Sequence, residues 1–375
     1  MAGIYIHIPF CRKFCNYCNF HRSTYVRNKN ILVKALIKEI GLKRNYLDNE
    51  PIETIYFGGG TPSILSVTEL SAITGTIYNT FNVIENAEIT LEANPDDLTT
   101  KYLYEVKRNI PINRLSIGIQ SFYDEHLKLM NRRHDSVQAL QSVKLSQEAG
   151  FSNISVDLIY GLPEMTAKMW YSNLLQTFNL FVQHISAYHL SFEPGTVFNK
   201  LLNEGKLARL SEDESLKQYE LLIEVSKNRN FIHYEISNFA LEGCFSVHNA
   251  NYWKQKKYLG IGPSAHSYNL ISRQWNISDN SKYLEGIKKG KPYTEIEILN
   301  TQTKFNDYVL TSLRTMWGIN IDYIENSFGK TYAEFISERI RKFSESYIIK
   351  QDNNYKLTHR GQFISDHIIS ELIFV

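Results

Sequence analysis

The sequence predicts an α/β protein, an incomplete (β/α)6 TIM-like barrel followed by a small, mainly helical C-terminal domain. Up to residue 190, short runs of β-branched and other apolar residues alternate six times with segments of helical periodicity. Such alternation is typical of parallel strands joined by right-handed helical crossovers. Six units rather than eight indicate a barrel that is open on one side, and a doubly wound open sheet is the alternative architecture.

The elements follow one another closely in this first part of the chain. Strands are expected at residues 4–8, 54–57, 88–92, 114–120, 153–159 and 184–190. Helices are expected at residues 28–46, 66–80, 99–108, 125–130, 136–149 and 168–180, where apolar residues recur on one helical face. Polar residues or glycines follow most of the strands. Because the ends of parallel strands meet at one edge, we expect a single functional face there.

The second part of the chain is less regular. A helix is expected at residues 211–227 and a strand at 231–239, and the polar, lysine-rich segment 278–292 is expected to be a linker. Residues 303–375 are expected to be mostly helical. We therefore divide the chain into a first domain, residues 1–285, and a C-terminal domain, residues 286–375.

The composition favours a soluble protein of a reducing compartment. The chain has 375 residues, 43% of them apolar, and a net charge of +2, which gives no electrostatic reason to expect a nucleic acid or an anionic membrane as partner. Four cysteines argue against a disulfide framework. No apolar run approaches the ~20 residues of a membrane span, and the first strand leaves no room for a signal peptide. We expect a cytoplasmic protein.

Three of the four cysteines lie on the loop after the first strand. Cys11, Cys15 and Cys18 are spaced four and three residues apart, just after Pro9 closes the strand. A structural zinc site needs four ligands, and His21 would supply the fourth. An iron–sulfur cluster held by only three thiolates keeps an open coordination position on one iron. The spacing favours the cluster and leaves zinc as an alternative.

Together with the strand-end motifs, this loop resembles the signature of the radical S-adenosylmethionine (SAM) superfamily, three cysteines spaced C-x3-C-x2-C. Further segments resemble the branch that contains the oxygen-independent coproporphyrinogen III oxidases and the HemW-type haem chaperones. They lie at residues 5–11, 57–62, 92–95, 118–122, 129–132 and 156–163, so that the resemblance covers nearly the whole chain. It implies a radical SAM core in residues 1–285 and a winged-helix-like C-terminal domain similar to that of the oxidases.

The resemblance implies two cofactors at the strand ends. A 4Fe–4S cluster would bind to the three cysteines, and its fourth iron would chelate SAM, whose reductive cleavage yields a 5′-deoxyadenosyl radical. The other residues that the resemblance assigns to the cluster and SAM are Tyr5, Tyr17, Gly58, Gly59, Gly60, Thr61, Glu92, Gln120, Arg132, Asp157 and Ile159.

Each of these roles has a physical basis and a plainer alternative. Glu92 and Asp157 would accept hydrogen bonds from the SAM amino group and ribose, although single carboxylates often serve as helix caps or surface charges. The guanidinium of Arg132 would pair with the methionine carboxylate in a fork geometry that lysine does not offer. The glycines would allow close approach of the ligand to the main chain, or simply form a tight turn.

Two features separate the haem chaperones from the oxidases. The oxidases carry a further cysteine two positions after the third, where this chain has Phe20, as the chaperones do. The chaperones also carry an H-N-x-x-Y-W motif, which residues 248–253 match in full. Histidine is a common axial ligand of haem iron, so His248 is a candidate haem-site residue, with His266 and Cys244 as rival ligands. A buried structural histidine is the plainer alternative.

The resemblance therefore implies a haem chaperone that binds haem and a SAM-ligated 4Fe–4S cluster and delivers haem to acceptor proteins, with respiratory-chain proteins among the candidates. The alternatives are an oxygen-independent coproporphyrinogen III oxidase and a zinc-stabilised α/β protein without radical chemistry. No catalytic residue is assigned, and whether the protein is an enzyme is left open. Peripheral membrane association and a homodimer are both compatible with the chaperone role.

Overall fold

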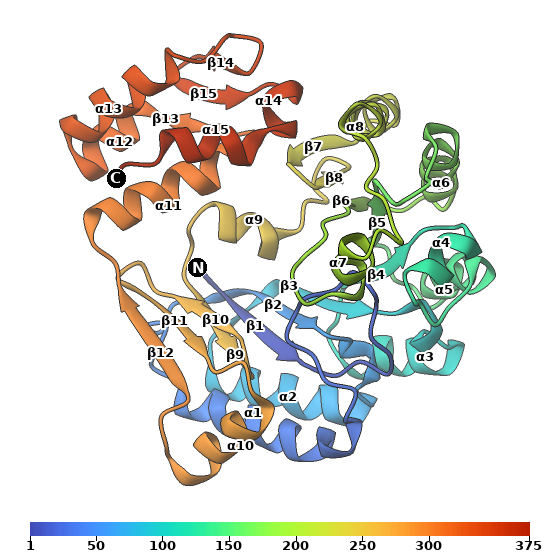
Figure 1. Ribbon diagram of the computed structural model, residues 1–375. Coiled ribbons are helices and arrows are strands. Elements are labelled where there is room, and N and C mark those ends of the chain that lie inside the picture. The colour runs from blue at the N-terminus through green and yellow to red at the C-terminus, as the bar shows by residue number, and fades with distance from the viewer.

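Six parallel strands form the centre of the protein in the computed structural model, which describes all 375 residues (Figure 1). They are β1 (Ala2–Ile8), β2 (Ile52–Gly59), β3 (Val83–Ala93), β4 (Arg114–Gln120), β5 (Ile154–Tyr160) and β6 (His184–His189). They lie side by side in chain order, without the reversal that a doubly wound sheet requires. Right-handed crossovers then place every helix on the same face, so the incomplete barrel is confirmed.

The helices of these units cover the outside of the barrel. They are α1 (Lys29–Leu42), α2 (Val67–Thr80), α3 (Thr100–Asn109), α4 (Asp124–Leu129), α5 (Ser136–Glu148) and α6 (Ala167–Asn179), with short 3-10 turns at Val26–Asn28, Pro62–Ile64 and Pro95–Asp97. Four of them begin where the side chain of Ser66, Thr99, Asp135 or Thr166 accepts a first-turn N–H. Outward-facing strand residues such as Ile6, Phe57 and Leu91 are fully buried beneath this layer.

The sheet continues past the six central strands on both sides. Beyond β1 lie β9 (Tyr258–Ile261), which is parallel to it, and the antiparallel strands β10 (His266–Tyr268), β11 (Ser272–Asn276) and β12 (Thr294–Ile298). Beyond β6 lie β8 (Asn238–Ala240) and β7 (Ile232–Glu235). The sequence analysis did not anticipate the extension from β9 to β12.

Two predictions for the second part of the chain are wrong. The strand expected at residues 231–239 is a hairpin, because the Glu235 carboxylate accepts the N–H of Ser237 and the side-chain amide of Asn238 and so turns the chain. The linker expected at residues 278–292 contains α10 (Asn280–Lys289). Asp279 caps this helix and Tyr283 lies fully buried on its inner face, so the polar composition concealed an amphipathic helix.

The remaining elements are three helices at different places around the barrel, followed by the C-terminal domain. The first group is α7 (Val197–Asn203), α8 (Glu212–Asn228) and α9 (Val247–Trp253). The C-terminal group is α11 (Thr301–Leu313), α12 (Ile321–Phe328), α13 (Lys330–Ile340), α14 (His359–Phe363) and α15 (Ser365–Leu372), with a small sheet of β13 (Ile319–Asn320), β15 (Asn354–Leu357) and β14 (Ile348–Gln351). The expectation of a mainly helical C-terminal part is met.

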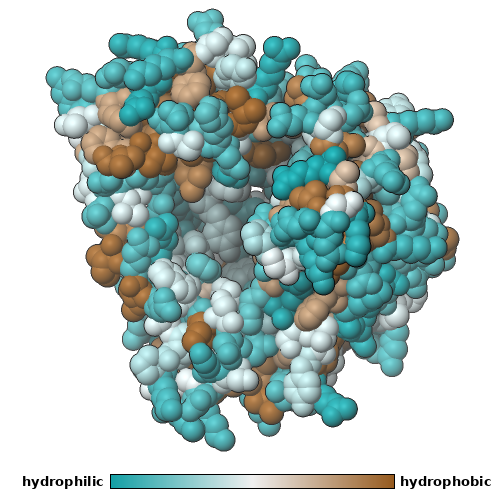
Figure 2. Space-filling view, viewed as in Figure 1, coloured by the Kyte–Doolittle hydropathy of each residue, from teal (hydrophilic) through white to brown (hydrophobic).

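Two hydrophobic cores are present, one of 64 buried residues in the barrel and one of 13 in the C-terminal part. The division at residues 285 and 286 stays a prediction, and that boundary falls inside α10. Because β12 still pairs with the barrel sheet, we prefer a boundary just after it. Figure 2 shows the molecule hollowed between the two parts, over α9. None of the helices has the length and apolar character needed to cross a membrane.

Candidate functional site

A cavity of about 430 Å³ lies at the carboxyl ends of the parallel strands. Its volume is in the range of small-molecule binding sites. The predicted site residues that line it are Cys11, Cys15, Tyr17, Cys18, Gly59, Gly60, Thr61, Glu92, Gln120, Arg132, Asp157 and Ile159. The structure thus brings the cysteine loop and the ends of five strands together around one space.

The cysteine loop is fixed to the barrel by hydrogen bonds along its length. The Cys11 N–H donates to the Ser23 carbonyl (3.0 Å), which closes the loop on itself. Asn16 donates its side-chain amide to the Leu129 carbonyl (2.8 Å), and Asn131 donates its own to the Phe14 carbonyl (2.7 Å). These bonds tie the loop to the end of α4, so the three thiols are held against the cavity before any ligand binds.

The three thiols fit a cluster better than zinc. All the cysteines are free, and no three His, Cys, Asp or Glu side chains lie close enough together to share one metal ion. The predicted fourth zinc ligand, His21, is engaged elsewhere, since its Nε2 lies 2.8 Å from Asn280 Oδ1. Zinc needs four donors within about 2.3 Å of one ion. Three thiols at the wall of a cavity, without a fourth, match a larger iron–sulfur cluster with one iron open to that cavity.

Hydrogen-bond donors face two of the sulfurs. Thr61 Oγ1 lies 3.5 Å from Cys11 Sγ, and Arg132 Nη1 lies 3.3 Å from Cys15 Sγ. Although burial lowers the pKa of Arg132, the facing Tyr17 and Cys15 raise it above its ordinary value overall, so the guanidinium stays charged. Donors and positive charge beside a sulfur stabilise the thiolate form that binds metal.

The same arginine keeps one donor unused. Arg132 Nη2 donates to Asn94 Oδ1 (2.7 Å) and to the Gly118 carbonyl (2.6 Å), which fixes the plane of the guanidinium. Its Nε is buried and has no hydrogen-bond partner. A buried donor without a partner costs about 1–3 kcal/mol, so a ligand carboxylate would be stabilised here.

Two carboxyl groups share the cavity with this arginine. Glu92 accepts hydrogen bonds from Tyr56 Oη (2.8 Å) and the Gly59 N–H (3.1 Å), and Asp157 accepts one from Ser116 Oγ (3.0 Å). Burial raises the pKa of Glu92 to about 7, with a further contribution from Asp157, and burial also raises the pKa of Asp157. A cationic ligand would relieve both effects, because it favours the charged carboxylates.

A buried arginine below the cavity was not anticipated. Arg114, at the start of β4, is only 1% exposed, and its charge opposes the rise in the pKa of both Glu92 and Asp157. Its Nε and Nη1 have no hydrogen-bond partner. The inside of this barrel is therefore charged and polar at mid-height, unlike the packed apolar interior of a complete barrel.

Three predicted residues do not line the cavity. Gly58 lies just below it, where an added Cβ would come within 2.8 Å of the Tyr5 ring and 3.2 Å of Glu92 Oε1, so the glycine is required for close packing. Tyr5 lies in the same layer, with its Oη 3.0 Å from His7 Nδ1. His248 lies on α9, beside Gly3 and Thr54 near the amino ends of β1 and β2.

The environment of His248 is closed. The side chain is 2% exposed, its Nδ1 lies 2.8 Å from Thr54 Oγ1, and its Nε2 lies 2.8 Å from Tyr252 Oη. Burial lowers the pKa of His248 to about 3, so the ring is neutral. The Glu88 carboxylate accepts the first N–H groups of α9, including that of His248 (2.9 Å). In this arrangement neither ring nitrogen is free to bind iron.

Several residues of the cavity were missed by the sequence analysis. Asn94 and Gly118 lie in the motifs at residues 92–95 and 118–122 but were given no role, and Ser116, Tyr188, His189 and Glu193 were not named. Ser116 and Gly118 share a strand face with Gln120, so the two-residue period of a strand was a signal that would have found them. Tyr188 and His189 end β6, and Glu193 lies in the loop beyond it, where no periodicity gives a direction.

The chain is similar to known proteins over its whole length. The family described as the Radical SAM superfamily matches residues 5–172. The haem chaperone HemW of Lactococcus lactis is 32% identical over 98% of this chain and 96% of its own, and HemW of Bacillus subtilis is 30% identical over 100% and 99%. Among solved structures, the coproporphyrinogen III oxidase HemN of Escherichia coli superposes with a TM-score of 0.85 at 21% identity, over 99% of this chain and 90% of that chain. This last likeness concerns the fold.

Proposed function

Because the chain belongs to the radical SAM superfamily, in the family of the HemW haem chaperones, we propose that it is a haem chaperone. It binds haem and a SAM-ligated 4Fe–4S cluster, and it delivers haem to acceptor proteins. The likeness to HemW proteins from end to end of the chain is the observation that carries this proposal.

The cofactor part of the proposal rests on the cavity. Cys11, Cys15 and Cys18 would hold the cluster at the wall of the cavity, and SAM would occupy the space that they line. When bound, this pair supplies one-electron cleavage of SAM. Arg132 offers its free Nε to the methionine carboxylate, and Glu92 accepts from the amino group.

The nucleoside part of SAM takes the other side of the cavity. Asp157 and Gln120 line the cavity on neighbouring strands and would form hydrogen bonds with the ribose hydroxyls. Tyr17 and Ile159 offer flat or apolar surfaces to the adenine. Residues 58–60 are glycines, so this stretch of main chain has no side chains to occupy the space proposed for the methionine end.

Position 20 supports the choice of a chaperone over an oxidase. Phe20 lines the cavity at its mouth and is 69% exposed. The resemblance places a further thiol here in the oxidases. A phenyl group has neither the acidity of a thiol nor its affinity for metal. This position therefore favours the chaperone, and coproporphyrinogen oxidation is the second candidate because the fold is shared with HemN.

One paired experiment tests the proposal. The full chain is reconstituted with iron and sulfide without oxygen, then titrated with haem and separately incubated with coproporphyrinogen III, SAM and an electron donor. We expect a brown protein with about four irons that binds haem stoichiometrically and forms no protoporphyrinogen. Turnover of coproporphyrinogen supports the oxidase instead. A colourless protein that contains zinc contradicts both.

The acceptor and the cellular setting are part of the same proposal. We propose haem-containing respiratory proteins as acceptors, reached from the cytoplasm, where the four free thiols stay reduced. Pull-down of haem-loaded protein against apo-acceptors tests this, and the haem-free protein is the control. A homodimer stays an expectation that sedimentation of the reconstituted protein checks.

A further inference from the structure

An arginine without a direct partner lies inside the barrel. Arg114, at the start of β4, is only 1% exposed, and its Nε and Nη1 have no hydrogen-bond partner. Burying a charged guanidinium in this way is costly unless other charges compensate it. Thr90 lies beside Arg114 in the register of β3 and β4 and is fully buried, and its Oγ1 also has no partner. The polar groups around this layer therefore decide what the arginine does.

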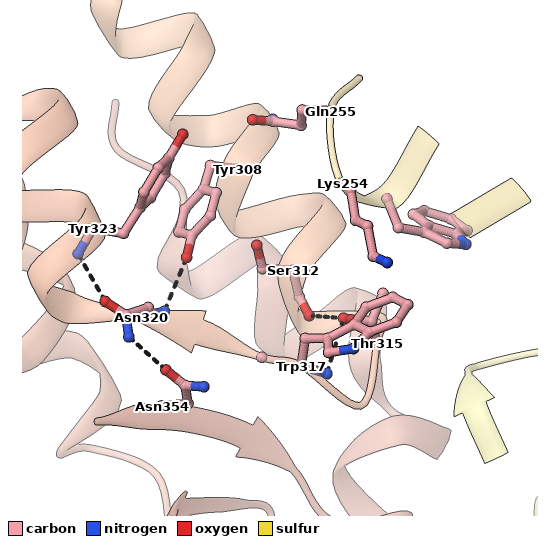
Figure 3. Close-up of a pocket in the computed structure, with 11 residues that line it drawn as sticks. Lys254, Gln255, Tyr308, Ser312, Thr315, Trp317, Asn320, Tyr323 and Asn354 are labelled. Atoms are coloured by element: carbon pink, nitrogen blue, oxygen red, sulfur yellow. Dashed lines mark hydrogen bonds between the residues drawn. The ribbon is translucent and has the colours of Figure 1, made fainter. Parts of the chain in front are cut away.

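A pocket of about 370 Å³ between α9 and the C-terminal domain shows the opposite arrangement (Figure 3). Its polar side chains bind one another. The Asn320 N–H donates to Tyr308 Oη (2.9 Å), and the side-chain amide of Asn320 donates to Asn354 Oδ1 (2.7 Å). No residue that lines this pocket has a buried polar side-chain atom without a partner. The unpaired groups that need an explanation are therefore those inside the barrel.

The strand register places Arg114 beneath the two carboxyl groups of the cavity. β4 lies between β3 and β5, which carry Glu92 and Asp157. Ser116 lies beside Glu92 in the register and donates to Asp157 Oδ1 (3.0 Å). Arg114 precedes Ser116 by two residues, so it faces the same side of β4 about 7 Å lower. Because Ser116 lines the cavity and Arg114 does not, the guanidinium lies one layer deeper than both acids.

The two acids need a positive charge nearby to be ionised together. Burial raises the pKa of Glu92 to about 7, with a further contribution from Asp157, and burial also raises the pKa of Asp157. The charge of Arg114 acts against these effects, because it lowers the pKa of both groups. A cation beneath a pair of carboxyl groups favours their charged forms.

The other titratable groups around this layer are neutral or engaged elsewhere. Burial lowers the pKa of His184, and it lowers that of His248 to about 3, so both rings are neutral. The Glu88 carboxylate accepts N–H groups of α9, and that of Glu235 accepts those of the β7–β8 turn. Arg132 is charged but donates its hydrogen bonds at the level of the cavity. Burial raises the pKa of the tyrosines of this layer, which are therefore neutral: Tyr5, Tyr56, Tyr188, Tyr234 and Tyr252.

We propose that Arg114 is a positioning residue for SAM, a buried counter-charge that lets Glu92 and Asp157 carry their negative charges together. This inference rests on the SAM binding proposed above. SAM carries a positive sulfonium centre, and its amino and ribose groups donate hydrogen bonds, so charged carboxylates bind it better than neutral ones. Arg114 acts only through the two acids. Because it lies beneath them and SAM would lie above them, the two cations stay on opposite sides of the carboxylates.

The test measures SAM affinity of the reconstituted full chain by equilibrium dialysis as the pH is varied. Arg114→Gln removes the charge and should weaken SAM binding about fivefold to tenfold at pH 7, with the midpoint of the pH dependence about one unit higher. The difference from the wild type should become smaller at pH 8.5, because the carboxyl groups then ionise without help. Arg114→Lys retains the charge and should keep the midpoint of the wild type.

Thr90→Val is the matched control, because it alters the same buried layer and removes an unpaired hydroxyl but no charge. It should leave the midpoint unchanged. If the wild-type protein binds no SAM, the proposed cofactor binding fails. If the wild type binds SAM and Arg114→Gln has the same affinity and midpoint, the proposed function stands and Arg114 has no positioning role. An equal shift in Thr90→Val also overturns the proposal, because it indicates a general disturbance of the layer.

A second comparison keeps the proposal testable if Arg114→Gln alone does not fold. Asp157→Asn removes one of the two acids, so the remaining carboxyl group needs less counter-charge. In this background, adding Arg114→Gln should change SAM affinity by less than about twofold, and urea unfolding should show a stably folded protein. If the double variant fails to fold while Asp157→Asn folds, or loses as much affinity as Arg114→Gln loses alone, the arginine serves the fold independently of the acids and the proposal is wrong.

Discussion

The two ends of the barrel differ in whether their buried polar side chains have hydrogen-bond partners. At the carboxyl end, Arg132 keeps a buried donor without a partner, and Glu92 and Asp157 share one cavity. At the amino end, both ring nitrogens of His248 and the first N–H groups of α9 have partners within 2.9 Å. Open hydrogen-bonding capacity marks a place for a ligand, whereas a closed network serves the fold.

This contrast indicates a structural role for His248 in place of the role of a haem-iron ligand. Both ring nitrogens of His248 have partners, and burial lowers its pKa to about 3, so the ring is neutral. Its contact with Thr54 holds α9 against β2. A free iron ligand would need one exposed nitrogen. Four variants test whether the carboxyl end is the ligand-binding end and the amino end the structural one.

Cys15→Ser should have the largest effect. A serine hydroxyl does not replace a thiolate on iron, and two remaining thiols do not hold a 4Fe–4S cluster. We expect loss of nearly all bound iron and of the brown colour after anaerobic reconstitution. Cys244→Ser is the control, because Cys244 lies on the loop before α9, outside the cavity, and should leave the iron content unchanged. Full iron content in Cys15→Ser would contradict the cluster site.

His248→Ala should act on stability. The change leaves Thr54 Oγ1 and Tyr252 Oη without their partner and removes the ring that stacks on Tyr56 at 5.0 Å. Two lost buried hydrogen bonds and a small void should lower the free energy of unfolding by about 3 kcal/mol. Urea unfolding measures this change. Unaltered stability together with lost haem binding would show that His248 is a haem ligand after all.

Arg132→Lys should weaken SAM binding. Lysine retains the charge but not the fork that bonds Asn94, Gly118 and Cys15 at once. The loss of a charged hydrogen bond to the carboxylate, about 1.5–3 kcal/mol, corresponds to roughly tenfold to hundredfold in affinity. Equilibrium dialysis of the reconstituted protein measures it. Arg133→Lys is a neighbouring control, since Arg133 pairs with Asp96 and Asp97, and a similar loss there would remove the special role of Arg132.

Much of the carboxyl-end site follows from the sequence because strand geometry places it. Residues 92 and 120 lie at the ends of β3 and β4, and residue 157 lies in the middle of the neighbouring strand β5, so their side chains face one space inside the barrel. The two-residue period of a strand tells which face a residue lies on, but it does not tell how deep in the barrel that residue lies. Tyr5 and Gly58 were assigned to the cofactors because a motif does not say how deep in the barrel each residue lies.

The closed network at the amino end could be predicted only with knowledge of where the helix α9 lies. On a helix, residues 248 and 252 share one face while residue 253 points well away from it. Tyr252 therefore bonds His248, whereas Trp253 lines a separate pocket between α9 and the C-terminal domain. The sequence analysis treated the motif as one unit and missed this division. Likewise, the bonds of Glu235 that fold the β7–β8 hairpin depend on side-chain contacts that no periodicity reveals.

The smallest effect is expected from Tyr56→Phe, and it concerns pH. The pKa of Glu92 is about 7 mainly because of burial, and the hydrogen bond from Tyr56 Oη lowers it. As the pH falls through this value the carboxyl becomes neutral, so SAM should bind more weakly on the acid side. Without the Tyr56 donor the pKa rises further, and the midpoint of SAM affinity should move up by less than about one pH unit.

Tyr5→Phe separates this effect from a general disturbance of the layer. Tyr5 stacks on Tyr56 at 6.1 Å, but its hydroxyl faces His7 Nδ1 rather than Glu92. Its removal should therefore leave the midpoint where it is. SAM affinity measured between pH 6 and pH 8.5 distinguishes the two variants. A midpoint that moves to lower pH in Tyr56→Phe, or an equal shift in both, would mean that Glu92 is not the group that couples SAM binding to pH.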